Sequence, residues 1–156
     1  MTKNVSERDW QAELARLQKL VDRSPHNTWL GLRFTAAGPE GIVIETGWRE
    51  EFISAPERRA VHGGVLAGLV DSGVVFAVMA ASGVMAATVD LRVDYHAIPA
   101  SDAMRISAKV IRLGRTLATA QASVYDATGR LTASGRGTVM VPETAEGRSS
   151  ARVRGP

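Results

Sequence analysis

A long apolar segment near the middle of the chain restricts the possible fold more than any other feature. Residues Val65 to Ala87 carry a single charge, Asp71, and the pattern predicts a helix from near His62 to Ser82-Gly83. The segment is long enough to cross a bilayer, so a small membrane protein is one interpretation. No aromatic belt flanks it, however, and a helix that is apolar all round also suits a buried core. We therefore expect a soluble domain without a membrane span.

After this helix the apolar period changes to two. Apolar and polar residues alternate from Thr88 to His96, which indicates a strand with one apolar face and one polar face. Three further strands are predicted at Met104 to Val110, Thr116 to Tyr125 and Leu131 to Val141. The first of these alternates like the strand before it, and turn residues such as Asp126-Ala127-Thr128-Gly129 separate the others. The pattern predicts a four-stranded antiparallel meander.

Before the helix, two short strands are predicted at Trp29 to Ala36 and Gly41 to Trp48, joined by a glycine- and proline-containing turn. A polar loop is expected from Glu50 to Val61. A curved sheet that wraps the apolar helix is one of few ways to enclose it. Such a sheet leaves edges exposed, and pairing with a second copy is a common remedy.

Three parts are expected along the chain: residues 1–26 with an N-terminal helix, a main domain at 27–141, and a disordered tail at 142–156. The helix is predicted from Ser6 to about Arg23, with Ser6 as N-cap and Asp9 three residues later. Ser24-Pro25 ends it, because the residue before proline avoids helical dihedral angles. A helix with one polar side is expected to cover an edge or a face of the sheet.

Composition excludes several classes of site. The chain has no cysteine, which excludes disulfides, thiolate metal sites and a cysteine nucleophile, and its three histidines show no metal-ligand spacing. The net charge of +3 comes without a nucleic-acid reading motif. The first ten residues lack the apolar stretch of a signal peptide. We expect no metal, no nucleic-acid partner and a cytoplasmic location.

The start of the long helix is one candidate site. His62-Gly63-Gly64 lies where the predicted loop enters the helix. Glycines let the backbone approach a ligand closely, and the first helical N–H groups have no partner within the helix. These groups and the helix dipole would stabilise a negative charge, as an oxyanion hole does. A plain glycine-rich helix start explains the same residues.

Asp71 is the second candidate, because it lies on an otherwise apolar helix. A carboxylate in that place loses hydration, so partners must support its ionised form. Its role could be that of a general base or a nucleophile. The alternatives are a structural hydrogen-bond acceptor or an exposed residue on a solvated strip.

These features resemble those of hotdog-fold acyl-CoA thioesterases of the phenylacetic-acid-degradation (PaaI-like) type. The resemblance rests on His62-Gly63-Gly64, on Asp71 nine residues after the histidine, and on Thr88-Val89-Asp90-Leu91-Arg92-Val93-Asp94-Tyr95 followed by Pro99-Ala100. Gly114-Arg115-Thr116-Leu117-Ala118 and Ala133-Ser134-Gly135-Arg136-Gly137-Thr138 also match. It covers roughly Trp29 to Val141. It implies an α+β hotdog fold in which a curved antiparallel sheet wraps the long helix, here with an extra N-terminal helix.

The resemblance also implies roles for particular residues in hydrolysis of an acyl-CoA thioester. Asp71 matches the nucleophile, or the base for an attacking water, and the Gly63 N–H matches the donor that polarises the thioester carbonyl. His62 matches a residue that shapes the helix entry, and Thr88 one that orients the water or the acid. Implied substrate-binding residues are Gly64, the turn of Gly114, Arg115 and Thr116, which matches a coenzyme A contact, and Tyr95 and Arg136.

The implied enzyme needs no cofactor, with coenzyme A entering as part of the substrate. It would be a homodimer or homotetramer with its site at the subunit interface, served by Asp71 and Gly63 from different subunits. The sequence departs from the family at one place: Pro56 occupies the region of an Asn that helps hold the carbonyl, and no Asn or Gln occurs from Arg49 to Val61. Arg58 or Arg59 could replace it. The alternative function is a non-catalytic hotdog dimer that binds acyl-CoA or a related ligand.

Overall fold

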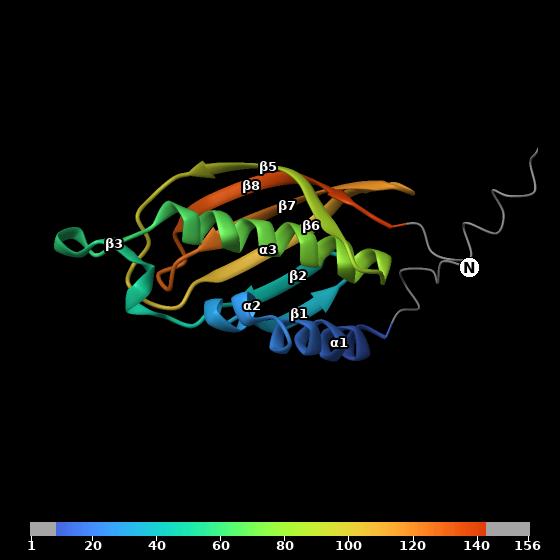
Figure 1. The fold of residues 1–156 in the computed structure, drawn as a ribbon, viewed down its shortest axis with the longest axis horizontal. Coiled ribbons are helices and arrows are strands. Elements are labelled where there is room, and N and C mark those ends of the chain that lie inside the picture. Colours follow the sequence, from blue (N-terminus) through green and yellow to red (C-terminus); the bar gives the residue numbers. More distant parts are fainter. Residues whose placement is uncertain (1–8, 143–156) are drawn as a thin grey trace, which may run out of the picture.

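One antiparallel sheet and the helix that it wraps form the centre of the molecule. The computed structural model describes residues 9–142, and within them the main sheet has six strands in the order β1-β2-β6-β7-β8-β5. The strands are β1 (Arg33–Gly38), β2 (Gly41–Glu45), β5 (Ala87–Tyr95), β6 (Arg105–Leu113), β7 (Leu117–Tyr125) and β8 (Leu131–Met140). The central helix α3 (Gly63–Ser82) lies across the face of this curved sheet (Figure 1). This is the hotdog fold that the sequence predicted.

The bounds of α3 agree with the prediction. His62 is the N-cap, and Gly83 ends the helix in the left-handed region at φ 77°. Gly73 allows α3 to lie close to the sheet, because a Cβ there would come within 2.8 Å of Ala122 and Ile106 side-chain atoms. By length and composition α3 could cross a membrane, but here it is mostly buried as the core helix of a wrapped sheet.

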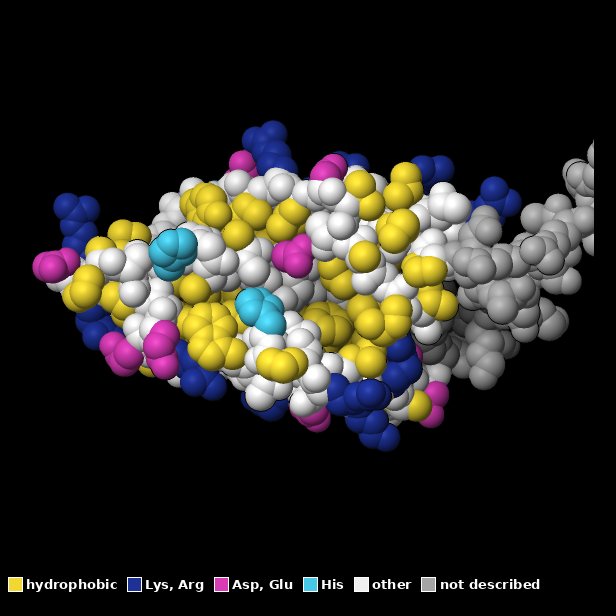
Figure 2. All heavy atoms as spheres, viewed as in Figure 1, with side chains coloured by type: hydrophobic (Ala, Val, Ile, Leu, Met, Phe, Trp, Pro, Cys, Tyr) yellow, Lys and Arg dark blue, Asp and Glu magenta, His cyan; other side chains and the backbone are white. Residues whose placement is uncertain are grey.

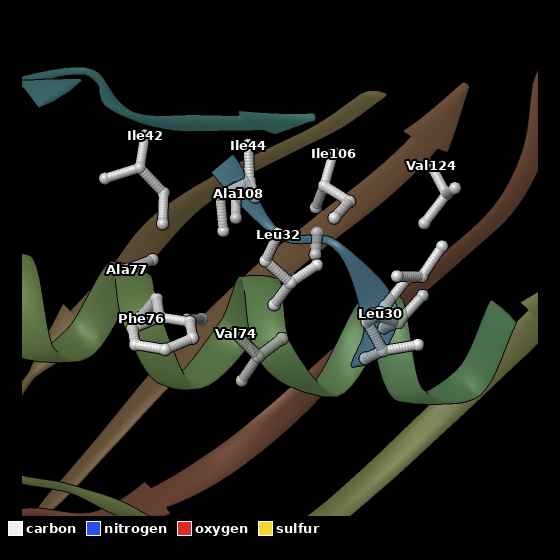
Figure 3. Close-up of a cluster of buried hydrophobic side chains, with 14 of the residues drawn as sticks. Leu30, Leu32, Ile42, Ile44, Val74, Phe76, Ala77, Ile106, Ala108 and Val124 are labelled. Carbon is white, nitrogen blue, oxygen red and sulfur yellow. The ribbon is translucent and has the colours of Figure 1, made fainter. Parts of the chain in front are cut away.

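Apolar side chains fill the space between α3 and the sheet. Ile106, Ala108 and Val124 point from the strands toward Val74 and Ala77 on the helix (Figure 3). All five are nearly inaccessible to solvent. In its second half α3 is buried on nearly all sides, whereas Gly64, Gly68 and Asp71 form a strip along the first half that is not fully covered within residues 9–142.

The region before α3 differs from the prediction in its helices and turns. Residues 25–30 form a second helix, α2 (Pro25–Leu30), so the strand predicted from Trp29 begins only at Arg33. Ser24 caps it, proline fits its first position, and Gly31 ends it at φ 67°. The predicted loop contains two 3₁₀ turns (Glu50–Phe52 and Pro56–Arg58) and a small hairpin of β3 (Ile53–Ala55) and β4 (Ala60–Val61).

The predicted meander is wrong in one connection. β6, β7 and β8 are consecutive neighbours, but β5 pairs with β8 and the hairpin β1–β2 joins the sheet at β6. Residues after β5 cross past β8 and β7 to reach β6, and the His96 and Ala97 amides donate to the Thr132 carbonyl at the start of this crossing. β5 therefore forms one edge of the sheet.

A β-bulge in β5 corrects the predicted alternation. The sequence pattern placed Thr88 and Asp90 on one polar face, but the pairing with β8 shifts between these two residues. Thr88 lies opposite Val139 and Leu91 opposite Gly137, so both face α3, whereas Val89 is the extra residue and is 59% exposed. The bulge turns the Thr88 hydroxyl toward the helix.

The other sheet edge is covered. Helix α1 (Trp10–Asp22) packs along β1, as a helix with one polar side was expected to do. The Gln18 side chain accepts a hydrogen bond from the Phe34 N–H at 2.9 Å and donates to the Leu32 carbonyl at 3.4 Å. The N-cap of α1 is Asp9, which accepts from the Ala12 N–H at 3.0 Å. The predicted cap Ser6 and residues 143–156 of the predicted tail lie outside the described residues.

The β7–β8 turn yields a prediction about acid stability. The buried Asp126 carboxylate accepts hydrogen bonds from Thr128, Arg130 and Ala100, and the Thr128 hydroxyl is the main cause that lowers its pKa from 3.8 to about 2. The folded chain thus binds this proton less readily than the unfolded chain. Its stabilisation, at most about 2 kcal/mol, is present above the unfolded pKa and is lost as pH falls toward 2.

We expect Asp126→Asn to lower the free energy of unfolding at pH 7 by about 1–2 kcal/mol. The difference from the wild type should shrink between pH 4 and pH 2, about the range between the two pKa values. Denaturant unfolding at several pH values measures it. Asp102→Asn, at an exposed carboxylate, is the matched control. A constant difference across this range would contradict the assignment.

Candidate active site

The first turn of α3 has an amide without a partner. The His62 N–H donates to the Phe52 carbonyl at 2.7 Å, the Gly64 N–H donates to His62 Nδ1 at 2.8 Å, and the Val65 N–H donates to the His62 carbonyl at 2.9 Å. The Gly63 N–H has no acceptor among residues 9–142. His62 therefore holds the helix entry, and the Gly63 amide remains a free donor at the positive end of the helix.

Tyr95 at the end of β5 lies beside this amide. A Cβ built on Gly63 would be 3.4 Å from the Tyr95 ring, and the ring is 57% exposed in the single chain. The sequence predicts both residues as part of the site but not their contact. The antiparallel course of β5 along α3 brings the last residue of the strand to the first residue of the helix.

Asp71 and Thr88 form the second part of the site. The Thr88 hydroxyl donates to Asp71 Oδ1 at 2.6 Å, and the carboxylate has no ion pair with a described residue. Asp71 is half-buried in the single chain, and its expected enclosure at a subunit interface stays a prediction. The sheet covers the opposite side of α3 and leaves Asp71 on a strip with Gly64 and Gly68. Hydrophobic side chains gather on this face of the molecule (Figure 2).

The two parts of the site are too far apart to act together within one chain. Gly63 and Asp71 are eight residues apart on α3, which corresponds to about 12 Å along the helix. An amide and a carboxylate that act on one thioester carbon must lie within a few ångströms of it. A single chain therefore holds two halves of a site.

The other predicted substrate-binding residues are divided between two places. Thr88 pairs with Val139, which pairs with Ala118, so the turn of Gly114, Arg115 and Thr116 lies two strands from Thr88 at the same end of the sheet. Gly114 fits this turn tightly, since a Cβ there would be 2.5 Å from the Leu117 carbonyl oxygen. Arg136 is exposed between two glycines that face α3, so it points to the opposite side of the sheet.

Arg58 and Arg59, the two arginines that could replace the missing Asn, differ in their contacts. Pro56 begins a 3₁₀ turn that ends at Arg59, in the left-handed region at φ 48°. The Arg59 guanidinium donates to Glu50 at 2.9 Å and to Ser101 at 3.2 Å, and its hydrogen bond lowers the pKa of Glu50. Arg58 is exposed. The Arg59 guanidinium is thus already paired with Glu50 and Ser101.

No three His, Asp or Glu side chains within residues 9–142 are arranged so that they could hold a metal ion. The titratable groups of the site are instead separated along α3 and β5. The chemistry that the arrangement offers is that of a carboxylate held by a hydroxyl, and of a backbone N–H aimed away from its own helix.

The fold and these two half-sites define a hotdog protein with a candidate acyl-transfer site. Residues 59–133 match the model of the thioesterase superfamily. A crystal structure of a thioesterase-superfamily protein is 43% identical and covers 84% of this chain and 99% of its own, with a TM-score of 0.82. The chain therefore belongs to the thioesterase superfamily, which supports a hydrolytic function of the thioesterase type.

Two further structures agree in fold. A Shewanella oneidensis protein related to the thioesterase superfamily is 25% identical, with a TM-score of 0.76, and covers 85% of this chain and 97% of its own. The Escherichia coli PaaI protein from the phenylacetic acid degradation operon has a TM-score of 0.75 at 15% identity, covering 85% and 96%. At that identity the likeness concerns the fold alone. A search of curated protein sequences found no match.

Proposed function

We propose that this protein is a homo-oligomeric acyl-CoA thioesterase that hydrolyses its substrate at the interface between two copies. The observation that carries the proposal is the pair of half-sites at opposite ends of β5: Asp71 with Thr88 at one end, and the free Gly63 amide with Tyr95 at the other. A second copy of the chain would bring the two half-sites together into one complete site.

The two edges of the sheet favour β5 as the place where copies pair. At β1, the Gln18 side chain occupies edge groups of the strand, and α1 covers it. β5 is nine residues long, contains no proline or lysine, and faces no described strand on its outer side. An edge of this kind is a template for another strand. Val89 and Tyr95, exposed along it, would be buried by the pairing.

A two-fold axis through the middle of β5 would join the half-sites. Antiparallel pairing of β5 with its copy about Leu91 and Arg92 sets the Thr88 end of one strand opposite the Tyr95 end of the other. Asp71 of one protomer would then lie near the partner subunit's Gly63. The dimer would have two equivalent sites, and further association into a tetramer would leave them unchanged.

In this site Asp71 is the base or the nucleophile. As base, its carboxylate takes a proton from water, and the hydroxide attacks the thioester carbonyl carbon. The oxyanion that forms accepts a hydrogen bond from the partner subunit's Gly63 N–H. The C–S bond then breaks, and the coenzyme A thiolate leaves and takes up the proton. Thr88 fixes Oδ1 of Asp71 and leaves Oδ2 for the water.

The remaining predicted residues receive supporting roles. The turn of Gly114, Arg115 and Thr116, at the Thr88 end of the sheet, is proposed to contact coenzyme A, with Arg136 on the outer face reaching only its distal part. His62 and Gly64 keep the helix entry in the geometry that frees the Gly63 amide. No cofactor is required, and a cytoplasmic location fits a coenzyme A ester as substrate.

Release of free coenzyme A tests the function. Incubation of the protein with a panel of acyl-CoAs and a thiol-detecting reagent should give saturable, enzyme-dependent colour at neutral pH. Pro56 in place of an Asn, with Arg59 already paired, favours the alternative of a non-catalytic acyl-CoA-binding dimer. A panel in which acyl-CoAs bind but no thiol appears would select that alternative.

A further inference from the structure

A hollow of about 310 Å³ opens beside the first two turns of α3. Its walls come from three elements that are distant in sequence. Trp29 and Leu30 belong to α2, Ile53 to β3, and Gly64, Val65 and Gly68 to α3. The titratable side chains of His26, Glu51 and His62 also line it, but apolar atoms make up the larger part of its surface. The volume is at the small end for a ligand pocket. The hollow therefore suits a compact apolar group.

The hollow adjoins the candidate active site, because His62 and Gly64 in its wall flank Gly63. Gly64, Gly68 and Asp71 follow one another at spacings of four and three residues, so they share one strip of α3. Gly63, the proposed oxyanion donor, directly precedes Gly64. An acyl group whose carbonyl oxygen meets the Gly63 N–H would therefore lie next to the wall of this hollow.

Packing within the described chain does not explain why position 68 is a glycine. Glycine is unfavourable in a helix interior, and at Gly73 close packing of the sheet explains it. A Cβ built on Gly68 would meet nothing within 4 Å. Gly68 lines the hollow, so the missing side chain enlarges the space there. A group that enters the hollow from outside the chain accounts for the glycine.

Trp29 forms a fixed aromatic wall. Its ring meets the Phe52 ring edge-on at 5.2 Å and stacks with His26 at 6.2 Å. Despite both contacts it is 36% exposed. Because packing contacts already hold the ring in place, it can bind a flat or compact apolar group with little loss of conformational entropy. Trp29 lies before the residues that match the superfamily model.

We infer that this hollow receives the acyl group of the substrate, and that Trp29 and Gly68 limit its size to compact apolar acyl groups. The inference rests on the proposed thioesterase function, and it assigns specificity to α2, a helix outside the matched residues. Long unbranched acyl chains exceed the hollow, and acetyl leaves it mostly unfilled.

Four substrates test the inference: acetyl-, hexanoyl-, benzoyl- and dodecanoyl-CoA. We expect the wild type to give its highest kcat/KM with hexanoyl- and benzoyl-CoA. Gly68→Ala should lower the ratio of kcat/KM for benzoyl-CoA to that for acetyl-CoA about tenfold or more, as one added methyl group does in a filled pocket. Trp29→Ala should raise the ratio for dodecanoyl-CoA to hexanoyl-CoA by a similar factor. A purely structural effect would change all four substrates alike.

Trp48→Ala is the matched control, because Trp48 also packs edge-on against Phe52, at 5.9 Å, but does not line the hollow. Its substrate ratios should equal those of the wild type. Unchanged ratios in Gly68→Ala and Trp29→Ala overturn the inference and leave the thioesterase function standing. If the wild type releases no coenzyme A, that function fails, and calorimetric Kd ratios for the same four compounds decide the inference. Unchanged Kd ratios, or no binding, overturn it.

Discussion

Asp71→Asn is expected to lower kcat for acyl-CoA hydrolysis by about 10²–10⁴-fold, the usual contribution of a general base. The amide cannot take a proton from water or attack the thioester. Its oxygen can still accept the Thr88 hydroxyl, which now lies 2.6 Å from Oδ1 of the carboxylate. The melting temperature and the oligomeric state should therefore remain close to those of the wild type. Steady-state kinetics with a thiol-detecting reagent measures the loss.

Asp90→Asn is the matched control for this variant. Asp90 lies two residues from Thr88 on the same strand, but the bulge turns it to the outer face, where it accepts from Thr138 at 3.4 Å. Asp90→Asn makes the same change of charge near the same strand edge, and its kcat should stay within a few-fold of the wild-type value. Equal losses in the two variants would point to net charge at the β5 edge, and full activity of Asp71→Asn would reject the mechanism.

Local patterns predicted the elements that depend on local rules. The length and apolar character of α3 and its glycine end were visible in the sequence, and so were the period-two strands after it. The position of β5 in the sheet was not, because pairing with β8 is a contact between segments about 45 residues apart. The alternation of apolar and polar residues within β5 does not show whether β6 or β8 is its neighbour in the sheet.

Errors before α3 have a different cause. The run from Trp29 to Ala36 alternates like a strand, but Ser24 and Pro25 start a helix that Gly31 ends after one and a half turns. A helix this short leaves too few residues for a 3.6-residue period to appear. The cap residues were the available signal. In the sequence the same two residues also mark the end of the preceding helix.

The candidate site could be predicted in part for similar reasons. The helix-start amide at Gly63 follows from local geometry, and the free N–H agrees with the expectation. The contact of Thr88 with Asp71 required the bulge, which a strict alternation hides. The half-buried state of Asp71 was not visible in the sequence. Full burial of its carboxylate requires contacts from outside the described chain.

Gly63→Pro is expected to reduce kcat/KM by about 10²–10³-fold, the cost of losing one oxyanion donor. Proline removes the N–H without disturbing the helix, because the first helical position has no intrahelical bond to lose. His62 has φ −62° and ψ 131°, which is the conformation that a residue before proline prefers. Gly63→Ala is the control: it keeps the N–H, and its Cβ would meet the Tyr95 ring at an ordinary contact distance of 3.4 Å. If both variants lose activity equally, steric crowding at Tyr95 explains the effect.

Mixing two inactive variants tests whether the halves of the site come from different protomers. A dimer of one Asp71→Asn chain and one Gly63→Pro chain would contain one site with both changes and one site with neither. Random exchange of equal amounts gives roughly half such dimers, so activity should return to roughly a quarter of the wild-type value. Each variant alone should remain inactive. If Asp71 and Gly63 of the same chain served one site, no dimer in the mixture would have an intact site, and activity would stay absent after exchange.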